Sequence, residues 1–509
     1  MANPSLQIGN GKWAIKEDSL LGYTELGNNI APVEIDMTRA SAGTRVNPQG
    51  LVETVELLGS EEVTNGDFAS GTTGWSVSYS GTLNNTGNAL NVVAIGVNDT
   101  RAATSITTVI GKIYKYVADI TQVQSTVTNL AVSNNSNLDG AFVNGSNITT
   151  PENGVTVFFT ATATTTYIGF KRGGSAATGI TNIYDNVSVK EVTQNNLARV
   201  DYTGSTSSLL AEPQRTNLLP YSEDFEKGNW TKTRCTAVIN QGISPDGNQN
   251  ASIITSTGAD ARIEDQVGSS GAEYTQSIYV KSAQATDVDC QIDFGGLNIV
   301  TFSANQEWQR VDTTLTNTSY SPRLRLRILN SGNSVYVWGG QLESGSYATS
   351  YIPTSGSTVT RVQDQYTKTG ISDKINSTEG TLFVEMAALA NDGTYRYVLL
   401  SDGATANMIQ IRYSDVSNNI QALVYSSSVL QAFTSYTPTD TTSFHKMAFK
   451  YKENDFALWV DGTEVGTATS GIPPINLSSL DFQSYFGKVK QLQVFKTALT
   501  DSELATLTT

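Results

Sequence analysis

Two long stretches of the sequence follow the same plan, roughly 150 residues apart. The first copy opens with the aromatic pair Phe68 and Trp75, and the second with Phe225 and Trp230. The copies close on similar segments, IYDNVSVKE in the first and VYVWGGQLE in the second. A repeat of this length is the duplication of a whole domain, and 509 residues are too many for one hydrophobic core. We therefore expect several domains in series, with both tryptophans packed in their cores.

Apolar and polar residues alternate over short segments, as they do in β-strands. In the first copy Val155, Val157 and Phe159 alternate with Thr156 and Thr160. Charged residues make up only 16% of the chain, too few for a set of helix bundles. The sequence therefore predicts an all-β fold class, with several jelly-roll or β-sandwich domains in series.

The charge balance limits the kinds of partner. Lys and Arg total 32 against 47 Asp and Glu, which gives a net charge of −15 and a sequence pI near 4.6. Such an acidic chain has no general attraction for a phosphate backbone, so we expect no direct nucleic-acid binding. No apolar run reaches the ~18 residues of a membrane span, and no secretory signal is visible. We therefore expect a protein that is made and folded in a cytoplasm.

Local motifs in three segments resemble two known families. The opening NGDF…W and the closing DNVSV resemble those of jelly-roll carbohydrate-binding modules, which implies a sugar-binding β-sandwich in each copy. Toward the C-terminus, FHKMAFKYKENDFALWVDGTEVG and FGKVKQLQVFKTALTDSELATL resemble concanavalin-like (laminin-G-like) sandwiches. In that segment Asp461-Gly462 predicts a hairpin turn. Thr500 and Glu503 predict the capping box of one short helix.

Further segments resemble a recurrent layout of tailed-phage virion proteins of the head-fibre or tail-fibre type. They are DMTRASAGTRVNPQGLVETV, NNLARVDYTGSTSSLLAEPQRTNLLPYSEDF and SYIPTSGSTVTRVQD. In the relatives GLVETV leads almost directly into ARVDY, so the first sandwich is expected to be an insertion whose two ends return to one small platform. The resulting division is a small N-terminal virion-mounting region at 1–58, an inserted carbohydrate-binding-module-like jelly roll at 59–192, a bridge at 193–215, a second jelly roll at 216–365 and a concanavalin/laminin-G-like sandwich at 366–509.

Side chains that could perform catalysis are few. The single histidine, His445, lies at the start of a sandwich strand, where a packing role is expected, and no Ser-His-Asp arrangement can be built around it. Cys290 alternates with apolar residues, which favours a buried free thiol over a disulfide with Cys235. One His and two distant Cys do not predict a zinc site. Two carboxylates suffice for glycan cleavage. No motif singles out such a pair, so we expect that the protein is not an enzyme.

Calcium and sugar sites are suggested at five residues. The resemblance to carbohydrate-binding modules implies a structural Ca²⁺ where the opening and closing strands meet, with Asp67 and Asp185 as candidate ligands. Plain turn and strand-edge roles are the alternative for both, and no other cofactor is expected. Tyr395, Tyr397 and Trp459 are candidates for stacking on sugar rings.

A stripe of arginines is a candidate partner-binding site. In PRLRLRILN, Arg323, Arg325 and Arg327 alternate with apolar residues and so share one strand face. Such a face could dock a carboxylate-rich partner or an acidic polysaccharide. The alternative is a solvated outer face paired with neighbouring acids.

Together the resemblances imply a structural component of a phage virion, an outward-facing fibre or decoration protein that mediates host attachment through glycan-binding sandwiches. Its partners would be other virion proteins, in the capsid or the tail, and host-surface or mucosal glycans. The relatives imply a homo-oligomer, a trimer, in which weak sugar sites gain avidity. Two alternatives stay open. One is a purely architectural capsid or tail subunit, and the other is a virion-borne polysaccharide depolymerase with its carboxylate pair in the concanavalin-like domain.

Overall fold

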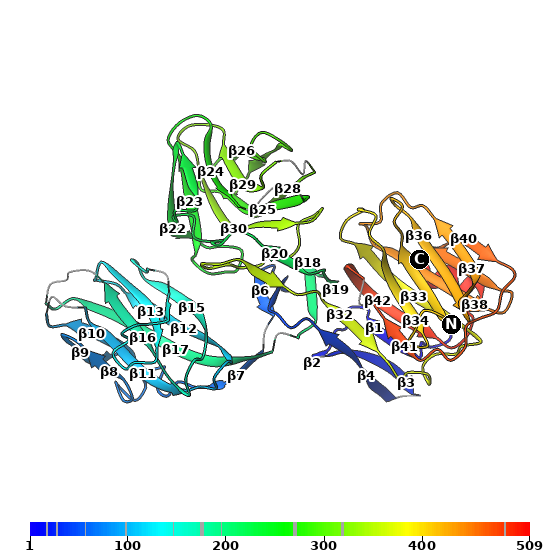
Figure 1. Cartoon of the computed structure of the whole chain (residues 1–509), viewed down its shortest axis with the longest axis horizontal. Coiled ribbons are helices and arrows are strands. Elements are labelled where there is room, and N and C mark those ends of the chain that lie inside the picture. Colours follow the sequence, from blue (N-terminus) through cyan, green and yellow to red (C-terminus); the bar gives the residue numbers. More distant parts are fainter. Residues whose placement is uncertain are drawn as a thin grey trace. The chain divides into compact units, whose positions relative to one another are not determined.

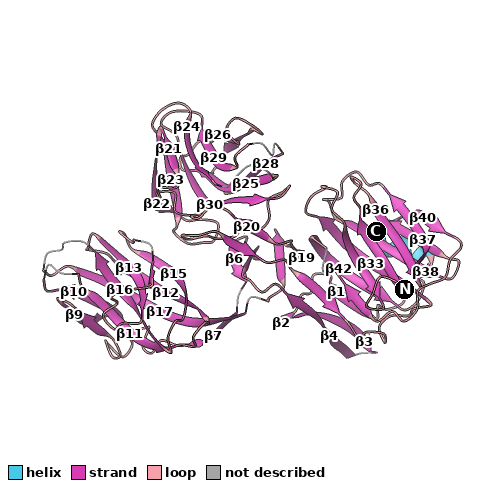
Figure 2. Ribbon diagram, in the orientation of Figure 1, coloured by secondary structure: helices cyan, strands magenta, loops and turns pink. Residues whose placement is uncertain are grey.

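The computed structural model describes the whole chain except residues 17–18, 27–28, 56, 97–98, 146, 174–177, 195, 268–271, 317–319 and 483–484. Among the described residues, strands dominate and the α-helix is the short α1 (Asp501–Thr508), as Figure 2 shows. No described helix has the length and apolar character to cross a membrane. The chain forms two compact units, Glu56–Gln194 and a second made of Met1–Val55 with Asn195–Thr509. The expected all-β fold class is confirmed.

The unit Glu56–Gln194 is a sandwich of two antiparallel sheets. The sheet orders are β15-β12-β17-β10-β9, with β7 added beside β17, and β14-β13-β16-β11-β8. Residues at alternate positions, among them Val155 and Phe159, point between the sheets and form the core. The strands are β7 (Leu57–Glu61), β8 (Ser76–Ser78), β9 (Gly81–Thr86), β10 (Ala89–Ala94), β11 (Arg101–Thr107), β12 (Ile113–Gln122), β13 (Val127–Ser133), β14 (Val143–Asn144), β15 (Glu152–Thr160), β16 (Thr165–Gly173) and β17 (Thr181–Gln194).

The two ends of this sandwich lie side by side. The antiparallel pairing of β7 with β17 places Leu57 opposite Gln194 and Glu61 opposite Lys190, and the two strands can be followed in Figure 1. The Glu61 carboxylate accepts a hydrogen bond from the backbone N–H of Val189 at 2.8 Å. The chain therefore enters and leaves the sandwich through neighbouring strands, which is the geometry that an inserted domain requires.

The second copy has the same strand order as the first. Its sheets are β28-β25-β30-β23-β22 and β27-β26-β29-β24-β21, which match the two orders of the first copy strand for strand along the chain. The duplication predicted from the sequence therefore extends to the whole jelly-roll topology. The strands are β21 (Thr231–Thr233), β22 (Cys235–Gly242), β23 (Ala251–Ser256), β24 (Ala261–Gln266), β25 (Tyr274–Ser282), β26 (Val288–Ile292), β27 (Val300–Ala304), β28 (Gln309–Leu315), β29 (Arg323–Ile328) and β30 (Ser334–Ser344).

The aromatic pair that opens each copy is buried in its core, as the sequence predicts. The ring centroids of Phe68 and Trp75 are 5.4 Å apart in the first copy, and those of Phe225 and Trp230 are 4.6 Å apart in the second. The indole N–H of Trp230 donates to the carbonyl of Tyr221 at 3.1 Å. The corresponding nitrogen of Trp75 is buried with no hydrogen-bond partner among the described residues.

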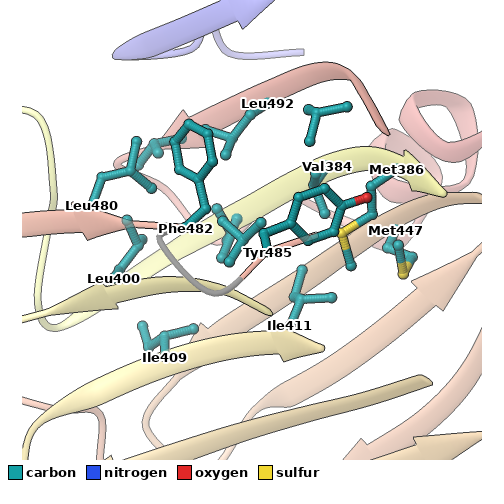
Figure 3. Packing of buried hydrophobic residues seen from close by; sticks show 14 of the residues in the cluster. Val384, Met386, Leu400, Ile409, Ile411, Met447, Leu480, Phe482, Tyr485 and Leu492 are labelled. Atoms are coloured by element: carbon teal, nitrogen blue, oxygen red, sulfur yellow. The ribbon is translucent and has the colours of Figure 1, made fainter. Parts of the chain in front are cut away.

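A third sandwich occupies the C-terminal part, and its strands pair in an order that closes on itself. Figure 3 shows its core, where Ile409 and Ile411 of one layer lie near Val384 and Met386 of the other. The strands from this part of the chain are β32 (Gln365–Lys368), β33 (Glu379–Ala388), β34 (Arg396–Ser401), β35 (Met408–Tyr413), β36 (Ile420–Ser426), β37 (Val429–Tyr436), β38 (His445–Lys452), β39 (Phe456–Val460), β40 (Thr463–Ala468), β41 (Ser479–Asp481) and β42 (Gly487–Phe495).

Strands from the N-terminus and from the expected bridge complete this third sandwich. β1 and β19 both pair with β42, and β4 pairs with β32. These added strands are β1 (Leu6–Gly9), β2 (Ile15–Lys16), β3 (Ser19–Leu26), β4 (Asn29–Thr38), β18 (Arg199–Thr203) and β19 (Thr206–Ala211). Two-stranded ribbons lie between the sandwiches in sequence, β5 (Gly43–Val46) with β6 (Val52–Val55) and β20 (Arg215–Asn217) with β31 (Val359–Arg361).

This arrangement differs from the predicted division of the chain. Residues 1–58 and 193–215 were expected as a mounting region and a bridge, each separate from the C-terminal sandwich. Instead Leu6, Ile35 and Leu209 are buried in the C-terminal core. The reason is physical. The edge of a sheet must be paired or covered, and strands from distant parts of the chain pair here.

Three of the segments that resemble the phage layout meet at a buried ion cluster, formed by Arg39, Arg199, Glu212, Arg361 and Asp364. Asp364 accepts from the guanidinium of Arg39 at 2.9 Å and also from Arg199. Glu212 accepts from Arg199 at 2.7 Å and from Arg361 at 3.0 Å. None of the five side chains is more than 3% exposed. Buried charges are tolerated only when they are paired in this way, so the cluster fixes the three segments to one another.

The cluster also sets the ionisation of its acids. Burial by itself raises the pKa of both carboxyls, since it disfavours the charged form. For Glu212 the neighbouring Arg361 and Arg199 outweigh burial and hold the pKa well below its ordinary value. For Asp364 the guanidinium groups of Arg199 and Arg39 do the same. Both acids are therefore carboxylates across the ordinary pH range.

Candidate glycan-binding surface

The histidine and the cysteines have structural roles. His445 lies at the start of β38, with Nδ1 2.6 Å from the Asp461 carboxylate and Nε2 2.8 Å from the backbone oxygen of Asp440. The imidazole thus joins the strand to the Asp461-Gly462 turn. Cys290 is buried in the second jelly roll and is free, as is Cys235, so the predicted free thiols are confirmed. Burial raises the pKa of Cys290 to about 12, which makes this thiol unreactive at neutral pH.

The two candidate calcium ligands are each engaged in local hydrogen bonds. The carboxylate of Asp67 accepts the N–H of Ala69 at 3.2 Å, and that of Asp185 accepts the N–H of Asn186 at 2.7 Å. The loops do meet, because the N–H of Val187 donates to the carbonyl of Gly66 at 2.9 Å. Among the described residues, however, no three acidic, His or Cys side chains gather to hold an ion. Calcium also takes backbone and amide oxygens, so the calcium site stays a prediction, with the turn and strand-edge roles as its alternative.

The arginine stripe is paired within the chain. Arg323 and Arg325 lie 3.2 and 2.7 Å from the Glu264 carboxylate, and Arg327 pairs with Asp260. The three side chains alternate with buried apolar residues along β29, as predicted. The stripe is therefore an outer face whose arginines are paired with neighbouring acids, and Glu264 is shared between Arg323 and Arg325.

Trp459 does not lie on an open surface, which corrects its assignment as a sugar-stacking residue. It is 9% exposed and packs with Leu499 and Leu504 beneath α1. The helix is held there by its predicted capping box, in which Thr500 and Glu503 bond each other's backbone N–H. Because α1 covers the outer side of β39, both faces of that strand are buried.

The two candidate tyrosines do share an open face, on the outer side of β34 and β35. Tyr397 lies directly opposite Arg412, which in turn lies opposite Gln421 of β36. In the next row Gln410 lies opposite Leu423, and Leu423 opposite Phe433 of β37. Ile409 and Ile411 point into the core in Figure 3, so Gln410 and Arg412 point outward between them.

We call the surface formed by Tyr395, Tyr397, Arg412 and Gln421, together with the buried Gln410 next to them, the Arg412 face. Tyr395 is 42% exposed, and the guanidinium of Arg412 lies 4.6 Å from the centre of its ring. A hydrogen bond to the Asp415 carboxylate raises the pKa of Tyr395 above its ordinary value, so the hydroxyl proton is already engaged and its oxygen is left to accept.

Two glutamines hold the guanidinium of Arg412 in place. The side-chain oxygen of Gln421 accepts from Nε at 2.8 Å and from Nη2 at 2.7 Å. The oxygen of Gln410 accepts from Nη1 at 3.4 Å. Exposed aromatic rings beside ordered amides and a guanidinium are the groups that recognise saccharides, since rings stack on apolar sugar faces and polar groups bond hydroxyls.

Sequence reasoning found the tyrosines of this face but not Gln410, Arg412 or Gln421. A signal was present in MIQIRY, where long polar side chains alternate with Ile409 and Ile411 as they do on the outer face of a strand. Only the pairing of β34 with β35 and of β35 with β36 brings the five side chains together.

Comparison with known proteins gives no family for the chain. No family model matches the sequence. No curated protein matches it either.

Several solved structures match parts of the fold. A sialidase carbohydrate-binding module (CBM40) from Ruminococcus gnavus, bound to α2,3-sialyllactose, is 11% identical and covers 26% of this chain and 84% of its own, with a TM-score of 0.23. Domain 4 of an extracellular arabinanase from Geobacillus stearothermophilus, with arabinotriose, is 12% identical and covers 33% of this chain and 84% of its own, with a TM-score of 0.25. The tandem CBM22 domains of a Paenibacillus barcinonensis xylanase are 12% identical and cover 58% of this chain and 98% of their own, with a TM-score of 0.21. Scores this low support no conclusion, and the topology rests on the strand pairing.

Proposed function

We propose that this chain is a structural component of a phage virion, an outward-facing fibre or decoration protein that attaches to glycans through its β-sandwiches and catalyses no reaction. The observation that carries the glycan-binding part is the Arg412 face, where the exposed Tyr395 and the half-buried Tyr397 lie beside ordered polar side chains. The virion part rests on the sequence resemblance of the segments that meet at the buried ion cluster.

Binding of this kind works through many weak contacts. A shallow sheet face buries little of a sugar, so each site is expected to be weak, with a dissociation constant on the order of millimolar. Several copies of the chain on one particle would raise the avidity by about 10²- to 10⁴-fold without any new contact. A homo-oligomer, such as the trimer that the resemblance implies, would supply those copies.

The test is a glycan array and a cell-binding assay with the full-length protein, each with and without EDTA. We expect saturable binding that is weakened by Tyr397→Ala. Tyr23→Ala, a tyrosine change outside this face, serves as the control. Loss of binding in EDTA would support the calcium hypothesis for Asp67 and Asp185. Shortened saccharide products in the same wells would show a depolymerase, and no binding to arrays or cells would favour the architectural subunit.

A further inference from the structure

Arg412 has an acid near it but no direct ion-pair partner, because the Asp415 carboxylate bonds Tyr395 and not the guanidinium. In the part of the chain that the structure describes, no carboxylate lies within ion-pair distance of its guanidinium. Arg323 offers a close comparison. It also lies over a tyrosine ring, 5.3 Å from the centre of Tyr320, but it pairs with Glu264 at 3.2 Å. Arg310 of β28 also lacks an ion pair among the described residues and lies 5.4 Å from the centre of the Tyr279 ring, so the missing acid alone does not single out Arg412.

The guanidinium of Arg412 is held in place by hydrogen bonds, but not all of its N–H groups have a partner. Three of its five N–H groups bond Gln421 and Gln410, which leaves one N–H on each terminal nitrogen without a partner among the described residues. The glutamine oxygens and the ring of Tyr395 fix the plane of the group before any ligand arrives. A planar fork that is ordered in advance loses little entropy when it binds a carboxylate.

We propose that the Arg412 face binds acidic saccharides, with the carboxylate of a uronic or nonulosonic acid on the guanidinium of Arg412 and the sugar ring beside Tyr395 and Tyr397. This inference rests on the proposed glycan binding and names its ligand class. A carboxylate fits because its two oxygens match the two remaining N–H groups. A saccharide fits because the neighbouring groups are tyrosines and amides, which take up a ring and its hydroxyls. An acidic peptide offers a carboxylate but no hydroxyl-bearing ring to lie beside it.

The experiment uses the full-length protein on an array of uronic and nonulosonic acid oligosaccharides, each printed beside its carboxyl-reduced form. Hits are then measured by titration calorimetry. We expect the native protein to bind the acid form at least about tenfold more tightly than the reduced form. Arg412→Gln should abolish this preference, so that the acid and reduced forms bind with equal affinity. Arg412→Lys should retain part of it, because a lysine keeps the charge but loses the planar fork.

Arg323→Gln is the matched control, since it makes the same change of charge at another arginine over a tyrosine and should leave the preference intact. Equal affinity for acid and reduced forms, or a preference that survives Arg412→Gln, overturns the acidic-saccharide inference while glycan binding stands. Binding to acidic peptides in place of the saccharides also overturns it. No binding to either form of any glycan overturns the inference and the proposed glycan-binding function together.

Discussion

The two jelly rolls have the same strand order but depend on the rest of the chain in different ways. The first is closed by the pairing of β7 with β17 and forms a unit of its own. The second is fixed to its surroundings just after its last strand. There the N–H of Ser350 donates to Glu212 of the ion cluster at 2.7 Å, and its hydroxyl accepts from Arg199 at 2.7 Å. One topology can therefore serve as an independent module or as part of a larger core, according to where its flanking residues bond.

The largest expected effect comes from breaking the ion cluster. Asp364→Asn removes the carboxylate that Arg39 pairs with and leaves Arg199 with Glu212 alone, which we expect to cost about 3–5 kcal/mol of unfolding free energy. The loss should fall on the unit that contains the second jelly roll and leave the protection of Glu56–Gln194 unchanged. Hydrogen exchange with mass spectrometry, resolved by peptide, measures both in one sample.

Asp139→Asn, which breaks an exposed ion pair with Arg101 in the first jelly roll, is the control and should change neither unit measurably. The pH dependence gives a second check. The folded-state pKa of Asp364 is depressed, so its stabilising contribution is present above the ordinary pKa near 4 and is lost as the pH falls. If Asp364→Asn destabilised both units equally, the two jelly rolls would not be independent.

A smaller effect is expected at Glu223, beside the opening strand of the second jelly roll. Burial raises the pKa of this carboxyl to about 7, although the hydroxyl of Tyr351 donates to it at 2.7 Å and opposes the shift. The folded protein then holds a proton that the unfolded chain gives up, so stability falls as the pH rises from about 4.5 to about 7.

Glu223→Gln should remove that fall and stabilise the second unit at pH 8 by about 1–2 kcal/mol, less than the full shift implies because the side chain keeps some contact with solvent. Thermal unfolding at pH 5 and pH 8 measures it. A variant that is no more stable at pH 8, while it folds normally at pH 5, would show that Glu223 is ionised at little cost.

The smallest difference is expected between the matched tryptophans. Trp230→Phe and Trp75→Phe remove the same atoms from equivalent buried positions, but only the first breaks an indole hydrogen bond, to the carbonyl of Tyr221. We expect Trp230→Phe to be more destabilising by about 1 kcal/mol. Urea denaturation of each unit gives the two values, and equal losses would mean that Trp75 also has a polar partner in solution.

The sequence predicted the features that depend on local pattern. Alternation of apolar and polar residues predicted the strands, and the repeated pair of Phe and Trp predicted the duplication. Thr500 and Glu503 predicted the start of the helix. It did not predict features that depend on distant pairing. Nothing near Leu6 indicates that its strand will pair with β42.

The candidate site shows the same limit. Tyr395 and Tyr397 were found because two tyrosines stand close together in the sequence. Trp459 was misassigned because the helix that covers it is specified some forty residues later, and a strand covered on both sides shows no alternation. The role of Arg412 depends on which side chains lie near it after folding, and the residues next to it in the sequence do not predict them.

The adjacent ends of the inserted jelly roll bear on how the chain folds. The segments on either side of Glu56–Gln194 would normally pair slowly, because closing so long a loop costs conformational entropy. Once β7 has paired with β17, the loop that the flanking segments must close is as short as a hairpin. An insert that folds first therefore shortens the effective loop between the flanking segments, which pair afterwards. Another domain with adjacent ends could therefore replace it without changing the loop-closure entropy that the surrounding unit must overcome.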